Sequence, residues 1–328
     1  MAPYAPASEA GKADGPQERE PWRELRRGGS GVRSSSLKVA PRLPGHRRDD
    51  RGLGHHVDRC RALPVGRSGR AAASAVVSLR EGAPRAPVKA PYSALAEVYD
   101  AIMQDVPYDL WCDFVLVELA SRGWSGRRLL DLGCGTGLAS EPYRRRGFEV
   151  LGVDPSAAMI GAARRRDPAA HYQLGDARTL ALDQRFDLVI AVFDALNNLT
   201  GDGELAAACE RVAAHLEPGG AFVFDVNTSV GLQALWEDDV AEGWAGDVYY
   251  RWEHVWDPSR RRARVAAYCR GPAGAFVEHH EERPFDPPEL AAALHAAGFA
   301  SAELITYPTG RPATDADPRV WAVARVPG

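Results

Sequence analysis

Nine residues, Leu129 to Gly137, constrain the fold of this 328-residue chain more than any other segment. They begin with a short apolar run that contains one acidic residue, Asp131, as expected of a buried strand. The glycines Gly133, Gly135 and Gly137 follow at alternate positions. Glycine lacks a Cβ and tolerates positive φ, so the backbone can turn tightly and approach a ligand closely. The segment therefore predicts a strand that leads into a ligand-binding loop and then a helix.

Strand-like and helix-like segments alternate around this loop, which predicts an α/β fold with a mainly parallel, doubly wound sheet of seven strands. Upstream, 92–103 and 108–121 are expected to be helical, with Leu110, Phe114 and Val117 on the buried face. Leu205 and Leu216 delimit the expected buried stripe of another helix. The remaining helices are expected at 140–146 and 156–166, and the strands at 128–132, 148–153, 171–174, 186–193, 221–226, 302–307 and 319–326.

The pattern changes between about 230 and 285. Three strand-like runs, 248–256, 264–270 and 276–283, are separated by turn-forming residues, which indicates an antiparallel insert, or cap, before the last helix. The α/β pattern then resumes at Asp286, where Asp-Pro-Pro-Glu resembles a capping box. Leu290 and Leu294 share the buried face of that helix, and Gly298 marks its end.

Residues 1 to 88 are expected to form a disordered basic tail, followed by one globular domain at 89–328. Residues 1–90 hold 18 Lys and Arg against nine Asp and Glu, a net charge of +9, whereas the remainder carries −13. The tail is rich in Arg, Gly, Ser and Pro and cannot bury enough apolar area to offset the entropy of ordering it. A basic arm for nucleic acid is the functional alternative, and the acidic globular part opposes it.

Other features place the chain among cytoplasmic, reduced proteins. The five cysteines are widely spaced without a C-x-x-C pair, as expected of free thiols. No apolar run approaches the roughly 18–20 residues that span a bilayer, so no membrane association is expected. His46, His55, His56 and Cys60 fit no regular zinc spacing, so no metal is expected.

Candidate ligand-binding residues follow consecutive strands, where an open α/β sheet binds its ligands. Asp154 ends the second strand, 21 residues beyond Gly133, and can accept hydrogen bonds from both hydroxyls of a ribose. Asp176 follows the third strand and can accept from an adenine amino group. A dinucleotide site would require G-x-G-x-x-G, but position 138 is Leu and the third glycine comes one residue early. The pattern favours a nucleoside without a pyrophosphate over a nicotinamide cofactor.

From about residue 92 onward the chain resembles class I S-adenosylmethionine-dependent methyltransferases. Five segments match that family's motifs in order: Leu129–Gly137, Val150–Asp154, Gly175–Ala177, Phe186–Ile190 and Leu216–Gly220. The resemblance implies a Rossmann-like fold and S-adenosylmethionine as cofactor. It implies that the glycine loop approaches the methionine part, with Asp131 helping to fix its amino group, and that Asp154 holds the ribose. It further implies that Met159 packs on the adenine, that Asp176 and Ala177 read its edge, and that Tyr92 and Tyr99 close over the cofactor.

Pro142 departs from the family pattern because it lies inside the helix expected after the loop. If Ser140 caps that helix, Pro142 falls in the first turn, where proline is tolerated. Asp187 is expected to be structural, at the edge of a strand.

Acceptor-side residues are expected at the ends of the fourth and fifth strands: Asp194, Asn197, Asn198, Asn227 and Thr228. Methyl transfer mainly needs alignment and exclusion of water, and a base only where the acceptor must lose a proton. On the third run of the insert, His279 and Glu281 point to one face and His280 and Glu282 to the other. Either histidine is a candidate base. The stripe Tyr250, Trp252 and Trp256 is expected to line a substrate pocket, form a homodimer contact or pack within the insert.

These patterns predict a methyltransferase that transfers a methyl group to nitrogen or oxygen of a small organic molecule. The insert resembles the caps of glycine and amino-sugar N-methyltransferases. The alternatives are a nicotinamide-dependent oxidoreductase, which the early third glycine opposes, and a nucleic-acid-modifying enzyme guided by the basic tail. Nucleic acid is the less favoured partner.

Overall fold

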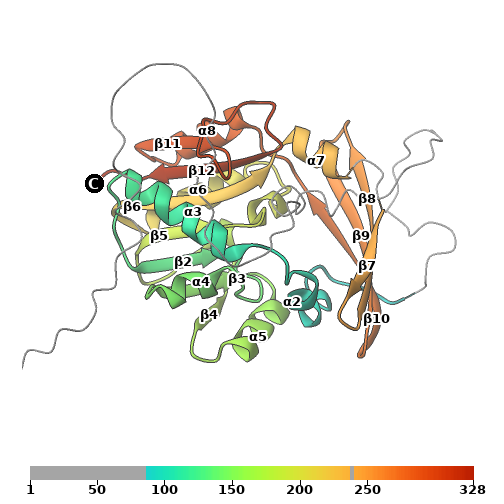
Figure 1. The fold of residues 1–328 in the computed structure, drawn as a ribbon. Helices are drawn as coiled ribbons and strands as arrows, with labels where there is room; N and C mark the ends of the chain where they lie inside the picture. Colours follow the sequence, from blue (N-terminus) through green and yellow to red (C-terminus); the bar gives the residue numbers. More distant parts are fainter. Residues whose placement is uncertain (1–85, 237–239) are drawn as a thin grey trace, which may run out of the picture. The chain divides into compact units, whose positions relative to one another are not determined.

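The computed structural model describes residues 86–236 and 240–328 (Figure 1). The predicted basic tail lies outside the described residues apart from its last three positions, and so do the histidines and Cys60 considered for a metal site. Within the described ranges, no helix is both long and apolar enough to cross a lipid bilayer. The four cysteines described are free and buried.

Seven strands form the central sheet, in the order β11-β12-β6-β5-β2-β3-β4. The five strands from β6 to β4 run parallel, whereas β12 is antiparallel to both β6 and β11. The predicted doubly wound, Rossmann-like sheet of seven strands is thereby confirmed. The strands are β2(Arg128–Leu132), β3(Glu149–Asp154), β4(His171–Leu174), β5(Phe186–Ala191), β6(Leu216–Asn227), β11(Ser301–Ile305) and β12(Arg319–Arg325).

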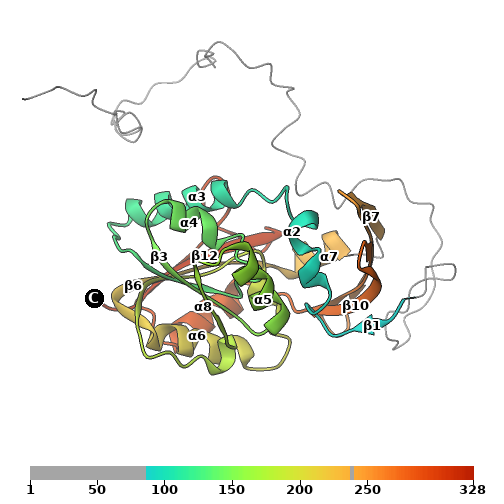
Figure 2. The same ribbon diagram turned by 90° about the horizontal axis from the view of Figure 1, so that it is seen from below.

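Helices cover both faces of this sheet because successive side chains of each strand point to opposite sides. Leu129 packs in a core with side chains of α3 and α4, whereas Leu130 packs with α6 and α8. Figure 2 shows α3 and α4 on one side of the sheet and α6 and α8 on the other. The helices are α2(Tyr99–Ile102), α3(Tyr108–Ser121), α4(Ser140–Arg145), α5(Ala157–Arg166), α6(Glu204–Ala214), α7(Ser229–Trp236) and α8(Pro287–Ala296), with short 3-10 turns η2(Leu95–Glu97), η3(Ala177–Thr179) and η4(Ala195–Asn198).

The insert forms a second sheet of five strands, in the order β1-β10-β9-β8-β7, which we call the cap sheet. The predicted meander is confirmed as β8(Val248–Asp257), β9(Arg262–Gly271) and β10(Gly274–Glu282), paired antiparallel. Two strands were not predicted. One is β7(Val240–Ala245) at the edge, and the other is β1(Val88–Lys89), which comes from the N-terminal side and pairs parallel with β10.

Several local predictions were wrong. Leu110 and Val117 are about half exposed, and α3 instead buries Cys112, Val115 and Leu119 along with Phe114. This helix is apolar on several faces, so periodicity alone does not select the buried one. Leu216 is not helical but begins β6.

The predicted cap of α4 was wrong, whereas that of α8 was confirmed in position but lacks the side-chain hydrogen bond of a capping box. Ala139 rather than Ser140 precedes α4, and this leaves Pro142 in the first turn as proposed. Asp286 precedes α8 as its N-cap, but its carboxylate accepts from the backbone N–H and hydroxyl of Ser229 instead of an N–H of its own helix. Gly298, with φ of +88°, ends α8 as predicted.

Candidate functional site

The glycine loop turns because its three glycines adopt left-handed backbone conformations, with φ of +76°, +53° and +84° at Gly133, Gly135 and Gly137. The Gly133 N–H donates to the carbonyl of Val153 at 2.7 Å, which ties the loop to the end of β3. A Cβ on Gly137 would collide with the ring of Tyr172, so this position also needs glycine for packing. A Cβ on Gly135 would meet nothing within 4 Å, so the loop has open space at its centre.

Asp154 lies directly beside this loop, as predicted. Its carboxylate accepts from the Gly135 N–H at 2.9 Å and from the Ser156 N–H at 2.8 Å. Burial raises the pKa of Asp154, and these two hydrogen bonds oppose the shift. Ser156 caps α5 by accepting from the Met159 N–H, which fixes Met159 in a fully buried position next to the loop.

Asp131 lies under the loop and is 1% exposed. The Ser140 hydroxyl donates to it at 2.6 Å, which explains why Ser140 is not free to cap α4. Burial raises the pKa of Asp131 to about 7, the Ser140 hydrogen bond lowers it, and the nearby Asp154 raises it. No cationic side chain of the described residues contributes to this balance, so a positively charged ligand beside Asp131 would stabilise the carboxylate.

These residues fit S-adenosylmethionine by their chemistry. The cofactor carries a sulfonium and an ammonium group, which match the uncompensated carboxyl of Asp131, and a ribose, which matches the carboxylate of Asp154. The open space at Gly135 permits close approach of a ligand to the loop. Asp176 fits less directly, because its carboxylate accepts from the backbone and guanidinium of Arg178, which lower its pKa. Its adenine contact, and that of Ala177 beside it, stay predictions.

Tyr92 connects the cofactor side with the cap sheet. It adopts φ of +55°, unusual for a residue with a side chain. Its carbonyl accepts from the Ser156 hydroxyl at 2.7 Å, and its own hydroxyl donates to Asn198 at 3.1 Å. Its N–H donates to Glu278 of β10 at 2.7 Å, and its ring meets that of His280 edge-on at 4.5 Å.

Tyr99 lies between the two sides of the site and hydrogen-bonds to Tyr108, a residue that sequence reasoning missed. Burial raises the pKa of Tyr99, and the carboxylates of Asp194 and Asp154 raise it further. Both carboxylates therefore lie near its hydroxyl, one from each side of the site.

The residues predicted on the acceptor side centre on a strained turn after β5. Phe193 and Asp194 both have left-handed φ, of +62° and +51°. Such strain persists where surrounding contacts enforce it, often at functional sites. Here the fully buried Asp225 of β6 accepts from the backbone N–H groups of both residues, at 2.7 and 3.3 Å. Arg319 of β12 then joins Asp225 and Asp194 through ion pairs at 2.5 Å.

Asp225 and Arg319 were not predicted, although an acidic residue inside the apolar β6 segment was a visible signal. Arg319 lies over the rings of Trp111 and Phe193, at 5.7 and 5.8 Å from their centres. Its position depends on the pairing of β12 with β6, in which Arg319 stands opposite Asn227. Strand pairing at this sequence separation leaves no local pattern.

The other predicted acceptor-side residues divide into two groups. Asn197 is fully buried, and its side chain is committed to the backbone. It accepts a hydrogen bond from the Asn227 N–H and donates to the carbonyls of Asn227 and Arg283. The Thr228 hydroxyl is bonded to the carbonyl of Asp317. Within the described residues, by contrast, the buried Oδ1 of Asn227 has no hydrogen-bond partner. The Asp187 carboxylate accepts from the backbone of residues 127 and 128, the structural position expected of it.

The predicted alternation on β10 is confirmed. His280 and Glu282 are buried on the face that Tyr92 contacts, whereas Glu281 is exposed and pairs with Arg264. His280 lies 3.2 Å from Glu278. His279 is on the outer face with Glu281, and its pKa is lowered by burial and by His280.

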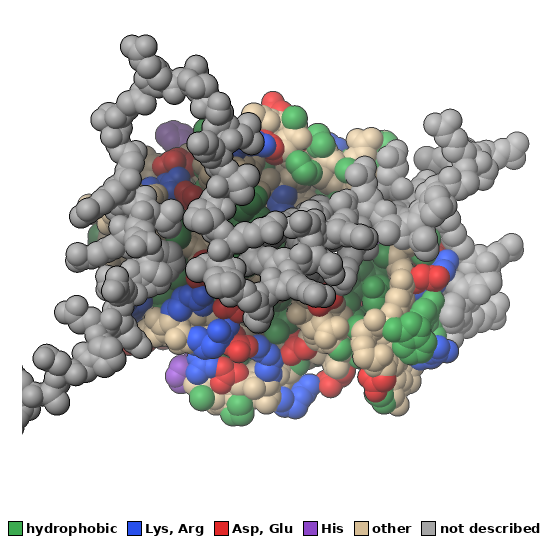
Figure 3. Space-filling model, in the orientation of Figure 1, with side chains coloured by type: hydrophobic (Ala, Val, Ile, Leu, Met, Phe, Trp, Pro, Cys, Tyr) green, Lys and Arg blue, Asp and Glu red, His purple; other side chains and the backbone are tan. Residues whose placement is uncertain are grey.

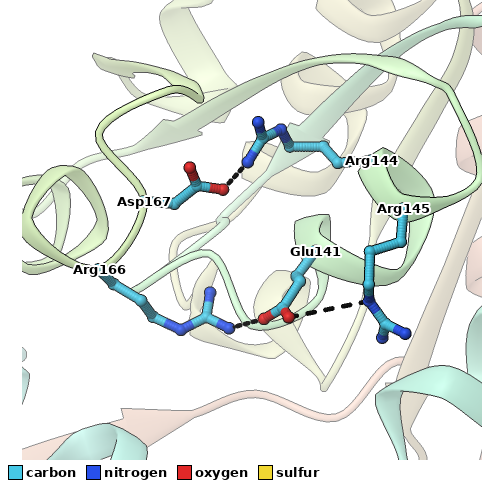
Figure 4. Close-up of a pocket in the computed structure, with 5 residues that line it drawn as sticks. All are labelled: Glu141, Arg144, Arg145, Arg166 and Asp167. Carbon is cyan, nitrogen blue, oxygen red and sulfur yellow. Dashed lines mark hydrogen bonds and ion pairs between the residues drawn. The ribbon is translucent and has the colours of Figure 1, made fainter.

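A polar hollow of about 420 Å³ lies between α4 and α5, lined by Glu141, Arg144, Arg145, Arg166 and Asp167 (Figure 4). Its charges pair within the group, and basic and acidic side chains are interspersed over this part of the surface (Figure 3). None of the predicted cofactor residues lines it. Among the described residues, no group of three His, Cys, Asp or Glu side chains could hold a metal ion.

Comparison with known proteins agrees with this arrangement. Residues 129–220 match the family model described as a methyltransferase domain. A protein of Bacillus subtilis (strain 168) named as a methyltransferase is 30% identical over 221 residues, covering 63% of this chain and 86% of its own length. The dTDP-3-amino-3,6-dideoxy-alpha-D-glucopyranose N,N-dimethyltransferase of Streptomyces fradiae is 32% identical, covering 68% and 91%.

A solved structure shares the fold. It is an S-adenosylmethionine-dependent methyltransferase from Clostridium acetobutylicum, with a TM-score of 0.62 and 23% identity over 72% of this chain and 98% of that one. The nicotinamide-dependent alternative therefore has no support, because both relatives are named as methyltransferases. The chain belongs to the S-adenosylmethionine-dependent methyltransferases.

Proposed function

We propose that this enzyme methylates nitrogen or oxygen of a small organic molecule bound between the carboxyl edge of the central sheet and the cap sheet. The observation that carries the proposal is the strained turn at Phe193 and Asp194, which Asp225 and Arg319 hold in place and which β10 faces from the cap sheet. S-adenosylmethionine supplies an activated methyl group when bound. The chain's task is then to align an acceptor and exclude water.

The cap sheet supports a small acceptor. It is tied to the central domain through Tyr92, through the Arg283 N–H, which donates to the Asn197 carbonyl at 2.8 Å, and through Arg262 of β9, which donates to the Thr200 carbonyl at 2.5 Å. These contacts place the cap sheet beside the edge where we propose that the acceptor binds. The Streptomyces fradiae relative acts, by its name, on an amino sugar attached to a nucleotide, and this favours a small-molecule acceptor for the present chain as well.

The test uses the purified full chain with S-adenosylmethionine and matched pairs of small amines and alcohols. Formation of S-adenosylhomocysteine and of a product heavier by one methyl group, detected by mass spectrometry, supports the proposal. The control is Asp154→Ala, which should lose turnover together with cofactor binding. If no small molecule is methylated while RNA or DNA fragments are, the nucleic-acid alternative replaces the proposal.

A further inference from the structure

Glu282 is the last residue of β10, and its carboxylate is buried without full hydrogen bonding. Its side chain is 6% exposed, and its Oε2 has no hydrogen-bond partner in the described part of the chain. The side chain of Asn227, at the end of β6, hydrogen-bonds to the carboxylate, but the buried Asn227 Oδ1 is itself without a donor. Buried acceptors are nearly always satisfied, so two unsatisfied ones in the same cluster call for an explanation.

The charges around Glu282 are mainly negative. From the turn after β5 the carboxylate of Asp194 faces it. From β12 the guanidinium of Arg319 faces it, but this group already pairs with Asp194 and Asp225. From the N-terminal segment Tyr92 faces it, and on β10 itself His280 points the same way but lies beside Glu278. Burial and Asp194 raise the pKa of Glu282, whereas Arg319 and Asn227 lower it by less.

This environment selects a ligand by its chemistry. Two buried acceptor atoms require donors, and an amine supplies two or more N–H groups from one atom whereas a hydroxyl supplies one. An excess of carboxylates favours a cation and disfavours phosphate, carboxylate or phenolate groups. A carboxyl group with a raised pKa is also suited to hold a proton taken from an amine.

We propose that Glu282 binds the amino group of the acceptor and takes up its proton before methyl transfer. The inference rests on the proposed function and narrows its acceptor to an amine. The amine binds as an ammonium ion, and Oε2 of the ionised Glu282 first takes one of its protons, which gives the nitrogen a free lone pair. The nitrogen then forms a bond to the methyl carbon as the carbon–sulfur bond breaks, the sulfur keeps the electron pair, and the product is the methylated ammonium ion.

Glu282 suits this role better than the two histidines of β10. His279 lies on the outer face of the strand, and its pKa is lowered by burial and by its neighbour. His280 packs edge-on against the ring of Tyr92, and its Nε2 lies 3.2 Å from the carboxylate of Glu278, although neither of its buried ring nitrogens makes a hydrogen bond within the described residues. The charge of Asp194, in the strained turn, reaches Glu282.

The first experiment compares Glu282→Gln with the wild type and with Glu281→Gln, which changes an exposed carboxylate on the outer face of the same strand. Glu282→Gln should bind S-adenosylhomocysteine within twofold of wild type by calorimetry, as should the control. With the amine that the wild type methylates best, kcat should fall by about 10²- to 10⁴-fold, and the rise of kcat with pH should disappear. Retained turnover, or loss of S-adenosylhomocysteine binding, would overturn the proposal.

A second measurement needs no turnover. In the presence of S-adenosylhomocysteine, benzylammonium should raise the melting temperature of the wild type and of Glu281→Gln but not of Glu282→Gln, and benzyl alcohol should raise none. If benzylammonium raises all three equally, or none, the Glu282 assignment is wrong. If the wild type methylates only hydroxyl groups, the proposed function stands and the amine inference fails. If nothing is methylated, the proposed function fails independently of this binding result.

Discussion

Replacing Asp131 with asparagine tests the electrostatic basis of cofactor binding. Asp131 is buried beneath the glycine loop, its hydrogen bond comes from the neutral Ser140 hydroxyl, and its pKa is raised to about 7. A cationic ligand beside it favours the ionised form. Binding of S-adenosylmethionine should therefore release a proton below pH 7, and its affinity should rise with pH.

The size of the effect follows from the two pKa values. If the cofactor returns the pKa of Asp131 to an ordinary value near 4, affinity rises about tenfold per pH unit below 7 and levels off above it. Between pH 5 and pH 8 the total is about 80-fold, or about 2.6 kcal/mol. Asp131→Asn carries no titrating group there, so its affinity should stay near the low-pH value of the wild type.

Calorimetry with S-adenosylmethionine at pH 5, 6, 7 and 8 measures this slope. Asp183→Asn, an exposed residue, is the matched control. Burial also raises the pKa of Asp154 and Glu282, so the ratio of wild type to variant at each pH is the quantity to compare. A wild-type affinity independent of pH, or a variant with the wild-type slope, would refute the reasoning.

The same shift makes a prediction about folding. Because the folded pKa of Asp131 is raised, its stabilising contribution is complete below the unfolded pKa near 4 and is lost as pH rises to about 7. Asp131→Asn should therefore be more stable than wild type without cofactor at pH 8, by at most about 4 kcal/mol, and the difference should vanish near pH 4. Urea unfolding at the two pH values measures it, and a variant less stable at pH 8 would contradict the prediction.

Three further changes test the fold around the site. Gly231→Ala in α7 should lower the free energy of unfolding in urea by about 1–3 kcal/mol, because its Cβ would come within 1.9 Å of a backbone carbonyl oxygen. The control Gly161→Ala, whose Cβ has room, should leave the free energy of unfolding unchanged or raise it. Equal effects of the two changes would contradict this prediction. Glu278→Gln should speed trypsin cleavage after Lys89. The Glu278 carboxylate accepts hydrogen bonds from four consecutive backbone N–H groups, and a neutral amide would satisfy them poorly. An unchanged cleavage rate would show that Glu278 does not hold this segment in place. Trp244 is 63% exposed on the edge strand β7, and we expect a homodimer contact there. Trp244→Glu should therefore convert a dimer to a monomer, as measured by light scattering. A wild-type protein that is already monomeric would refute the contact.

The central fold could be predicted because its signals are local. β2 and β4 have the predicted bounds, since each is a short run with turn-forming residues at its end. β7 and α7 were missed for the opposite reason. The sequence of β7 does not alternate polar and apolar residues, and α7 is a short apolar segment without a polar face. β1 has only two residues, and it is a strand because β10 offers it an edge.

The residues of the site also divide into those that a local sequence pattern indicates and those that depend on distant strand pairing. Asp131, Asp154 and the loop glycines were predictable because each directly follows or lies within a recognisable strand, and the loop brings them together. Asp225 and Arg319 are 94 residues apart, and their ion pair depends on the antiparallel pairing of β6 with β12. Glu282 was placed on the correct face of its strand, but the unsatisfied Oε2 became visible only in three dimensions.

The contacts of Tyr92 explain why the two halves of the site belong to one unit. Its carbonyl accepts from the Ser156 hydroxyl, and the Ser156 N–H in turn donates to the carboxylate of Asp154, which we predict to bind the ribose. Its N–H is bound by Glu278 on the cap sheet, and its hydroxyl by Asn198 on the acceptor side. The backbone of Tyr92 holds a positive φ that these contacts must maintain. Displacing the cap sheet would therefore move Tyr92 and, through Ser156, disturb the support of Asp154. Tyr92 thus positions both Asp154 and β10, the strand that carries Glu282.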